Sequence, residues 1–385
     1  MAKRRARPLG GVAMKVALDV SAVPAKLAGA GRYVAEVARR LPDADVATTL
    51  VTRRGDATRW QGVSPQAQVK GLVPNGRAAR LAYEAWLLGT SATARDVDLW
   101  HAPHYTMPRR GPTPTVVTIH DLTFFTNPEW HERSKVAFFR RAITYSAHHA
   151  RVLISVSDFS ARLLATLIPD HAPVVVAPLG VELGTFQPLD RGDGAVLHDH
   201  GLRTDVPFIF FVGTVEPRKG LDVLLDAFEL IARDNTDVEL WLAGQAGWGE
   251  GPIEAKIKGH PFFARIQRLG FVDEALLPVL YRRARAVTYP SRGEGFGLPV
   301  LEAMACGASV VTTRDTVMAE IAGDGARLVP VGDAQALATS LDDVLASSDD
   351  ERRTWARRAR ERAEHFTWEH CVAQHLVTYE MAMGR

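Results

Sequence analysis

Short runs of apolar residues alternate along the chain with longer segments in which apolar residues recur every three or four positions. The runs predict buried β-strands, and the spacing of three and four predicts amphipathic helices. The series begins with a strand over residues 14–19 and a helix whose inner face carries Val34, Val37, Ala38 and Leu41. A second long helix is predicted over 134–150. The further strands predicted in this half cover 97–101, 115–120, 152–156 and 174–177.

A segment rich in glycine and proline, residues 184–207, interrupts this alternation and predicts a linker. The alternation restarts with a wholly apolar run over 208–212, followed by a helix over 221–232. From Asp349 onward the chain is predicted to be helical in two pieces, with Thr367 as the cap of the second. The remaining strands predicted in this half cover 238–242, 265–270, 286–289, 309–312 and 327–329.

The two halves predict an α/β protein of two domains, residues 12–190 and 205–365. Strand and helix alternate in each half, which is typical of a doubly wound parallel sheet of the Rossmann type. A chain of 385 residues is long enough for two such cores. Sheets of this type bind ligands at the carboxyl ends of their strands, so the expected site is a central cleft between the domains.

Composition narrows the class of protein. With 46 Lys and Arg against 44 Asp and Glu, the net charge is only +2, which excludes a typical nucleic-acid binder. The two cysteines, Cys306 and Cys371, suit a reducing compartment, and a cytoplasmic location is expected. No apolar run is long enough for a transmembrane helix. The basic residues 1–7 predict a frayed tail rather than a signal peptide, and such a tail allows weak contact with anionic lipid.

The strongest candidate site is the glycine-rich segment 291–307, directly after the strand over 286–289. Glycines at 293, 295 and 297 allow a tight, open loop. Pro299 suits the start of a helix and Gly307 suits its end. The amides of residues 296–298 are then expected to point out of a helix N-terminus, where phosphate oxygens bind.

Charged side chains accompany this loop and a second one. Glu294 in the loop is predicted to face a sugar hydroxyl, and Glu302 in the following helix a ribose; a glycine-rich turn with a capping glutamate is the alternative. In the segment 213–220, Arg218 and Lys219 precede a helix whose dipole favours an anion. A guanidinium fork and an ammonium point charge suit a diphosphate, although a solvated basic turn would look the same.

Two segments together resemble the motifs of the GT-B glycosyltransferases of family 4, retaining enzymes that use nucleotide sugars. They are Gly213-Thr-Val-Glu-Pro-Arg-Lys-Gly220 and Glu294-Gly-Phe-Gly-Leu-Pro-Val-Leu-Glu302. Looser matches occur in the same order in the amino-terminal half, at 29–33, 118–122, 155–160 and 177–181. The resemblance implies a GT-B fold, with two Rossmann-like domains facing a central cleft. It also implies that the last helix, 367–385, packs back on the amino-terminal domain.

The resemblance implies a role for each matching position. Arg218 and Lys219 would hold the donor diphosphate, Glu294 the donor sugar and Glu302 the ribose, while the backbone of Val272 would contact the base. Gly31 would let the backbone approach the diphosphate from the opposite domain. The donor-binding residues implied in this way are Gly31, Gly213, Arg218, Lys219, Val272, Glu294, Gly295, Phe296, Gly297, Leu298 and Glu302.

The catalytic residues implied are Arg218, Lys219, Glu294 and His120, with His120 across the cleft near the reacting sugar. Positive groups at the diphosphate would stabilise the leaving nucleoside diphosphate. A double displacement needs a carboxylate on the sugar face, and the sequence singles out none. The resemblance therefore favours a front-face reaction in which a leaving phosphate oxygen takes the acceptor proton.

Three further polar residues near predicted strand ends are candidates for the acceptor side: His101, His104 and Asp121. The two histidines are also compatible with satisfied structural positions. A metal site is not expected, because Pro103 separates them from a common helical face and no third ligand is evident. No cofactor is expected besides the nucleotide-sugar co-substrate.

The sequence thus predicts a metal-independent, retaining hexosyltransferase that uses a nucleotide sugar, with GDP-mannose preferred over UDP-glucose, and a hydroxyl of a glycan or lipid-linked acceptor. Two alternatives stay open: a nucleotide-sugar epimerase of the same plan, and a non-catalytic scaffold in envelope polysaccharide assembly. The helix over 134–150 carries Phe138, Arg140 and Arg141, which suits either a membrane surface or one core face and one solvated face. We therefore also expect weak peripheral contact of the protein with the inner face of the membrane.

Overall fold

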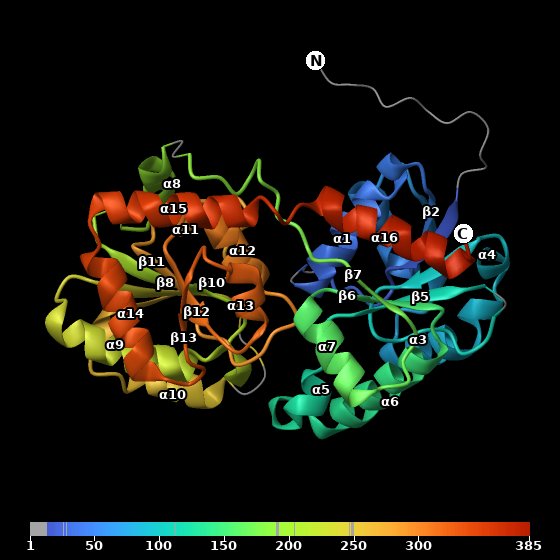
Figure 1. Ribbon diagram of the computed structural model, residues 1–385, viewed down its shortest axis with the longest axis horizontal. Coiled ribbons are helices and arrows are strands. Elements are labelled where there is room, and N and C mark those ends of the chain that lie inside the picture. Colours follow the sequence, from blue (N-terminus) through green and yellow to red (C-terminus); the bar gives the residue numbers. More distant parts are fainter. Residues whose placement is uncertain are drawn as a thin grey trace, which may run out of the picture.

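Two α/β domains lie side by side in the computed structural model, which describes residues 14–25, 27, 29–111, 113–189, 192–203, 205–245, 247 and 250–385 (Figure 1). The basic segment 1–7 lies outside the described residues. Each domain is built on one sheet in which every strand pair is parallel. These two parallel sheets confirm the predicted fold class, two Rossmann-like domains of the GT-B type.

The amino-terminal sheet has seven strands in the order β3-β2-β1-β4-β5-β6-β7, and the carboxyl-terminal sheet has six in the order β10-β9-β8-β11-β12-β13. Six adjacent strands of the first sheet and all six of the second follow the Rossmann order 3-2-1-4-5-6. The strands of the first sheet are β1 Lys15–Asp19, β2 Ala47–Arg53, β3 Gln68–Val73, β4 Leu99–Ala102, β5 Thr115–Ile119, β6 Val152–Ser155 and β7 Val174–Val176. Those of the second are β8 Phe208–Val212, β9 Glu239–Ala243, β10 Ile266–Gly270, β11 Ala286–Tyr289, β12 Val310–Thr313 and β13 Arg327–Val329.

Helices cover both faces of each sheet. In the amino-terminal domain they are α1 Ala30–Arg40, α2 Ala57–Val63, α3 Arg77–Trp86, α4 Ala92–Arg95, α5 Thr123–Thr126, α6 Arg133–His149 and α7 Asp158–Leu167. The remaining helices are α8 Asp193–Asp199, α9 Leu221–Asp234, α10 Gly251–Lys258, α11 Leu277–Arg283, α12 Leu298–Ala305, α13 Val317–Ala322, α14 Ala334–Ala346, α15 Asp349–Ala363 and α16 Trp368–Met383.

In the amino-terminal sheet, alternate residues of a strand enter different cores, as the pleat requires. In β1, Val16 and Leu18 pack on one side with α1, while Ala17 packs on the other side with Ile143 and Ala147 of α6. Both sides of the sheet are therefore buried, which explains why the strands read as continuous apolar runs.

The eleven predicted strands all occur, within one or two residues at their ends. β2 and β3 were not predicted; β2 mixes three threonines with its apolar residues, and β3 is a half-exposed edge strand that pairs only with β2. The predicted linker 184–207 is also not wholly irregular, because α8 lies within it. Asp193 at the start of α8 accepts two 2.7 Å hydrogen bonds from Arg282, which ties that helix to the carboxyl-terminal domain.

The chain passes between the domains twice. Figure 1 shows α15 along one domain and α16 along the other, joined by a short connection. α16 covers β4, β5, β6 and β7, so the last helix packs on the amino-terminal sheet. The two crossings lie together, because Val181 N donates to the carbonyl of Phe366 at 3.0 Å, and a Cβ on Gly180 would lie only 2.2 Å from the nitrogen of Trp368.

Candidate active site

Two loops from the carboxyl ends of β8 and β11 meet at the edge of the carboxyl-terminal sheet. Arg292 N donates to the carbonyl of Arg218 at 2.8 Å, and Ser291 Oγ donates to the same oxygen at 3.0 Å. Gly220 has a φ of 70°, and a Cβ there would lie 2.1 Å from the carbonyl oxygen of Pro290. Only glycine fits at this position, so the backbone itself fixes the loop 213–220 against the loop 291–297.

The carboxylate of Glu294 lies at the centre of these loops. Arg218 Nη1 donates to one of its oxygens at 2.6 Å, and Lys219 Nζ donates to the other at 2.5 Å. Ser291 Oγ at 2.9 Å and Tyr289 OH at 3.2 Å donate to that second oxygen as well. Burial by itself would raise the pKa of Glu294, but Arg218 and Lys219 outweigh it and lower the pKa to about 2.

The two cations are held in a largely buried position. Lys219 is 7% exposed, and burial lowers its pKa although Glu294 acts in the opposite direction. For Arg218, burial is outweighed by Glu294 and Glu216, and the pKa is raised. Such a cluster binds an anion without first having to order long, flexible side chains. The sequence did not point to Tyr289, whose hydroxyl accepts from Lys219 Nζ at 2.5 Å; its place at the end of the strand before the loop is the available signal.

The start of α12 adds backbone donors to the same place. Its N-cap, Gly297, has a φ of 119°, which a residue with a side chain rarely adopts. The amides of Phe296, Gly297 and Leu298 donate no hydrogen bond to any of the described residues. Since the helix dipole favours negative charge here, these three amides can bind phosphate or hydroxyl oxygens.

His120 faces these loops from the amino-terminal domain. A Cβ on Gly295 would lie 2.0 Å from the carbonyl oxygen of His120, so the two domains touch at this glycine. Ser157 Oγ donates to the carbonyl of Gly295 at 3.0 Å. Nearby, Glu320 accepts from the amide of Asp158 at 2.9 Å across the same boundary. The structure therefore brings His120 and the Glu294 loop together.

The ring of His120 has a defined role for each nitrogen. Nε2 lies 2.7 Å from the carbonyl oxygen of Pro103 and must donate to it, which leaves Nδ1 as an acceptor. Tyr33 packs edge-on against the ring at 5.1 Å between centroids. Burial lowers the pKa of His120, although the Pro103 carbonyl acts against this, so the ring is neutral at pH 7.

Glu302 is engaged from the opposite domain. Arg32 of α1 forms ion pairs with both Glu302 and Glu274, and Tyr281 OH donates to Glu302 at 3.1 Å. Burial raises the pKa of Glu302 although Arg32 acts against it. No role for Arg32 was predicted from the sequence; its place directly after the glycines of the segment 29–33 is the signal that could have identified it.

The comparisons with known proteins agree with this geometry. Residues 27–185 match the family model for Glycosyltransferase Family 4, and residues 196–362 match the model for Glycosyl transferases group 1. The chain belongs to the GT-B glycosyltransferases of family 4. It is 29% identical to O-antigen chain mannosyltransferase B of Escherichia coli, over 96% of this chain and 100% of that protein.

Two more proteins resemble this glycosyltransferase over nearly its whole length. A D-inositol 3-phosphate glycosyltransferase of Geodermatophilus obscurus is 29% identical over 99% of this chain and 92% of its own. The solved structure of sucrose-phosphate synthase from Thermosynechococcus elongatus superposes with a TM-score of 0.76 at 22% identity, covering 95% of this chain and 98% of that one. The structural likeness shows the shared GT-B fold.

Three other positions expected to bind the donor have distinct surroundings in the glycosyltransferase. Gly31 lies inside α1, where a Cβ would be 3.4 Å from Leu27. Gly213 is the first residue of the loop 213–220, and its carbonyl oxygen would be only 1.8 Å from a Cβ on Gly244. Val272, in the loop after β10, has no hydrogen bond from its N–H or carbonyl to the described residues. Its backbone is therefore available to a ligand.

The acceptor-side expectation for His101 needs correction. The side chain is wholly buried, with Nδ1 2.8 Å from the hydroxyl of Tyr379 and Nε2 2.8 Å from Thr118 Oγ1. Tyr33 OH continues this network to His375 Nε2 at 2.7 Å. Because both nitrogens are satisfied beneath α16, His101 holds the last helix on the sheet and does not line the cleft.

His104 and Asp121 lie closer to the donor loops. The ring of His104 is 5.2 Å from that of His120. Asp121 accepts from Tyr105 OH at 3.1 Å and from Thr123 Oγ1 at 2.6 Å, and its Cβ would be 3.2 Å from a Cβ on Gly295. Asp121 therefore supports the wall of the cleft, with its oxygens already occupied by these donors.

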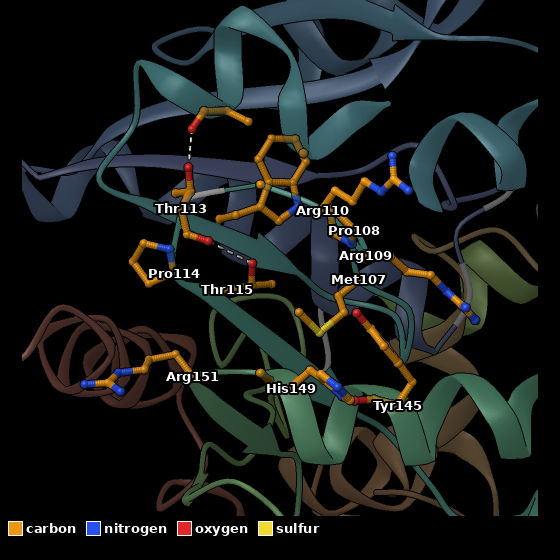
Figure 2. Close-up of a pocket in the computed structure, with 15 residues that line it drawn as sticks. Met107, Pro108, Arg109, Arg110, Thr113, Pro114, Thr115, Tyr145, His149 and Arg151 are labelled. Atoms are coloured by element: carbon orange, nitrogen blue, oxygen red, sulfur yellow. Dashed lines mark hydrogen bonds between the residues drawn. The ribbon is translucent and has the colours of Figure 1, made fainter. Parts of the chain in front are cut away.

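A cavity of about 470 Å³ lies on the far side of the amino-terminal domain (Figure 2). Thr115, the first residue of β5, and Arg151, just before β6, line it, so it opens at the amino ends of the strands. Arg109 and Arg110 lie on one side of it and Arg151 on the other. It therefore lies at the opposite end of the strands from the candidate active site, which is at their carboxyl ends.

Metal and membrane features were also sought in the part of the chain that the structure describes. No group of three or more His, Cys, Asp and Glu side chains is arranged there to hold a metal ion. No helix among those residues has the length and apolar character needed to span a bilayer. In α6, Phe139 stacks on Phe124 at 4.5 Å and Arg140 Nε donates to the carbonyl of Phe124 at 2.7 Å, so this face belongs to the core.

Proposed function

We propose that the protein is a retaining, metal-independent mannosyltransferase that moves mannose from GDP-mannose to a hydroxyl of a glycan or lipid-linked acceptor. The full-length likeness to an O-antigen chain mannosyltransferase supports mannose as the sugar. The segment Thr214-Val-Glu-Pro-Arg-Lys219, which resembles mannosyltransferases of the family, supports the same donor. We place the reaction in the cytoplasm, with weak peripheral contact at the inner face of the membrane where a lipid-linked acceptor would be met.

The observation that carries this proposal is the preformed anion site beside His120. Arg218, Lys219 and the amides of 296–298 offer positive charge and donors at the carboxyl edge of the second sheet. Glu294 is the negative partner that both cations share, and Arg218 also pairs with Glu216. A diphosphate would take over Arg218 and Lys219, and Glu294 would then be released toward the hydroxyls of the donor sugar.

In the proposed reaction the bond from the anomeric carbon to the phosphate oxygen breaks, and the acceptor oxygen bonds to the same face of the sugar. The acceptor proton passes to the leaving phosphate oxygen, so the products are the glycoside and GDP. Arg218 and Lys219 stabilise the charge that develops on the diphosphate. His120 Nδ1, the free acceptor on a neutral ring, would accept a hydrogen bond from a hydroxyl of the donor sugar.

The test is to measure donor binding and transfer with purified variants. Binding of GDP-mannose, UDP-glucose and ADP-glucose is measured by thermal shift and calorimetry, and transfer by radiolabelled product. Arg218→Ala and Lys219→Ala should each lower the transfer rate about 10²–10³-fold, because each removes one donor from the diphosphate. Exposed residues of the same domain supply matched controls, Arg353→Ala and Lys258→Ala.

Three results would reject the proposal. Full donor affinity in Arg218→Ala and Lys219→Ala would show that the diphosphate binds elsewhere. Conversion of the nucleotide sugar into its epimer, rather than its hydrolysis, in the absence of any acceptor would instead identify an epimerase. Donor binding without turnover on any acceptor would identify a scaffold.

A further inference from the structure

A polar cluster lies at the carboxyl end of β1, and we call it the Asp19 cluster. It consists of Asp19, Ser21, Arg80, Glu84 and His104. Ser21 N donates to Asp19 Oδ1 at 3.0 Å, and Ser21 Oγ donates to Glu84 Oε1 at 2.6 Å. Arg80 Nη1 donates to the same Glu84 oxygen at 2.8 Å. These bonds join the end of β1 to α3 at one edge of the sheet. His104, in the segment after β4, lies near enough to Arg80 for that guanidinium to lower its pKa.

Several polar atoms of this cluster have no hydrogen-bond partner among the described residues. The bonds above use one oxygen of each carboxyl group, and no hydrogen bond from a described residue reaches Asp19 Oδ2 or Glu84 Oε2. His104 Nε2 is buried and likewise has no partner among the described residues. A buried polar atom without a partner costs free energy, so its retention points to a ligand that satisfies it.

The cluster carries no excess of positive charge. Its one guanidinium, on Arg80, is already paired with Glu84. Burial, and then Glu84, raise the pKa of Asp19 to about 7, although Ser21 and Arg80 act in the opposite direction. The charge on His104 is suppressed too, because burial, His120 and Arg80 together lower its pKa to about 3. Near neutral pH the cluster thus offers hydrogen bonds without a cationic centre.

The cluster adjoins the reacting centre. β1, β4 and β5 are neighbours in a parallel sheet, so their carboxyl ends lie at the same edge as His120. The ring of His104 is 5.2 Å from the ring of His120, and the carbonyl of His120 meets the donor loop at Gly295. A molecule bound to His104 and the two carboxyl groups would lie beside the donor sugar, on the amino-terminal side of the cleft.

We infer that the Asp19 cluster binds the hydroxyls of an uncharged sugar ring, the unit of the acceptor that receives the transferred sugar. Paired carboxyl oxygens and a neutral imidazole nitrogen suit vicinal hydroxyls, which donate and accept at short spacing. A phosphate group in this place would meet the oxygens of Asp19 and Glu84, and like charges within about 4–6 Å repel. The inference rests on the proposed function, and it excludes a phosphorylated polyol as the acceptor unit.

Transfer from GDP-mannose provides the test, with four acceptor probes: methyl α-mannopyranoside, its 6-phosphate, myo-inositol and inositol 3-phosphate. Each is assayed with the full-length wild type, Asp19→Asn, Glu84→Gln and Ser21→Ala. Asp170→Asn supplies a matched control, because it makes the same change at an exposed carboxylate of the same domain. Hydrolysis of GDP-mannose without acceptor is followed in parallel and reports on folding and the donor site.

The wild type should use methyl α-mannopyranoside with a lower KM than the phosphorylated probes. Asp19→Asn and Glu84→Gln should raise that KM about tenfold or more while donor hydrolysis stays unchanged. Ser21→Ala, which removes one donor to Glu84, should have a smaller effect in the same direction. Preference for either phosphorylated probe, an unchanged acceptor KM in both carboxyl variants, or donor hydrolysis with no transfer to the mannoside would overturn the inference. A wild type that binds no GDP-mannose would instead reject the proposed function.

Discussion

Gly295 is the position at which a single methyl group is expected to separate the two domains. A Cβ at this residue would lie 2.0 Å from the carbonyl oxygen of His120, whereas real Cβ atoms essentially never approach closer than 3.0 Å. The obstacle is backbone, so it cannot be avoided by a change of rotamer. In Gly295→Ala the loop 291–297 and the end of β5 must therefore move apart by about 1 Å or more.

Under the proposed function, this displacement falls on the groups that bind the donor and the reacting sugar. A misplacement of about 1 Å commonly costs about 10²-fold in rate, since reacting atoms must be held close to their bonding distance. We therefore expect the rate of mannosyl transfer in Gly295→Ala to fall about 10²-fold. GDP binding should change much less, because Arg218, Lys219 and the amides of 296–298 all belong to one domain. The melting temperature should remain near that of the wild type, because each domain keeps its own core.

The assay is steady-state transfer from GDP-mannose together with calorimetry of GDP binding. Gly251→Ala makes the same change where a Cβ would have no atom within 4 Å, and it should behave as the wild type. A Gly295→Ala enzyme with undiminished kcat would show that the domains do not need this contact during catalysis. An equal loss of GDP affinity would show that the loop itself, rather than its fit against His120, had been damaged.

Two further predictions concern stability. Burial and Glu84 raise the pKa of Asp19 from 3.8 to about 7, so its contribution to the free energy of unfolding is fully present below about pH 3.8 and is lost as pH rises through about 7. Urea unfolding at pH 5 and 8 should show this loss in the wild type and not in Asp19→Asn. The same change of unfolding free energy with pH in both proteins would contradict the prediction. Tyr379→Phe removes the hydroxyl 2.8 Å from His101 Nδ1 and should lower the free energy of unfolding in urea by about 1–3 kcal/mol. In the control Tyr83→Phe, the hydroxyl that is removed has no partner among the described residues, so the free energy of unfolding should not change measurably.

Local patterns predicted most of the fold because most strands are buried on both faces. Such strands appear in the sequence as short aliphatic runs, and β8 and β11 are examples. β3 is different, because it is an edge strand whose residues are largely half-buried or exposed, and its sequence Gln-Val-Lys-Gly-Leu-Val carries no continuous run. A strand that packs on one side only gives a weaker pattern, and for that reason β3 was missed.

The candidate site was predictable where its residues are close in the sequence. Arg218 and Lys219 share one loop, and Glu294 shares another with the amides of 296–298. Contacts between distant segments were not predictable from spacing. Arg32 meets Glu302 across 270 positions, and His101 meets Tyr379 across 278. His101 illustrates the difficulty, since a histidine at a strand end looks the same whether it faces a cleft or lies beneath a helix.

The position of α16 also has a consequence for how the protein is made. The amino-terminal sheet is synthesised before the carboxyl-terminal domain, yet the helix that covers β4 to β7 is synthesised after that domain. At about 5–20 residues per second, the intervening carboxyl-terminal domain separates the two by roughly ten to forty seconds. During this time His101 and Thr118, which lie beneath α16 in the folded chain, stay uncovered. The domain that begins first is completed last, so a chain stopped before Thr367 would leave it open.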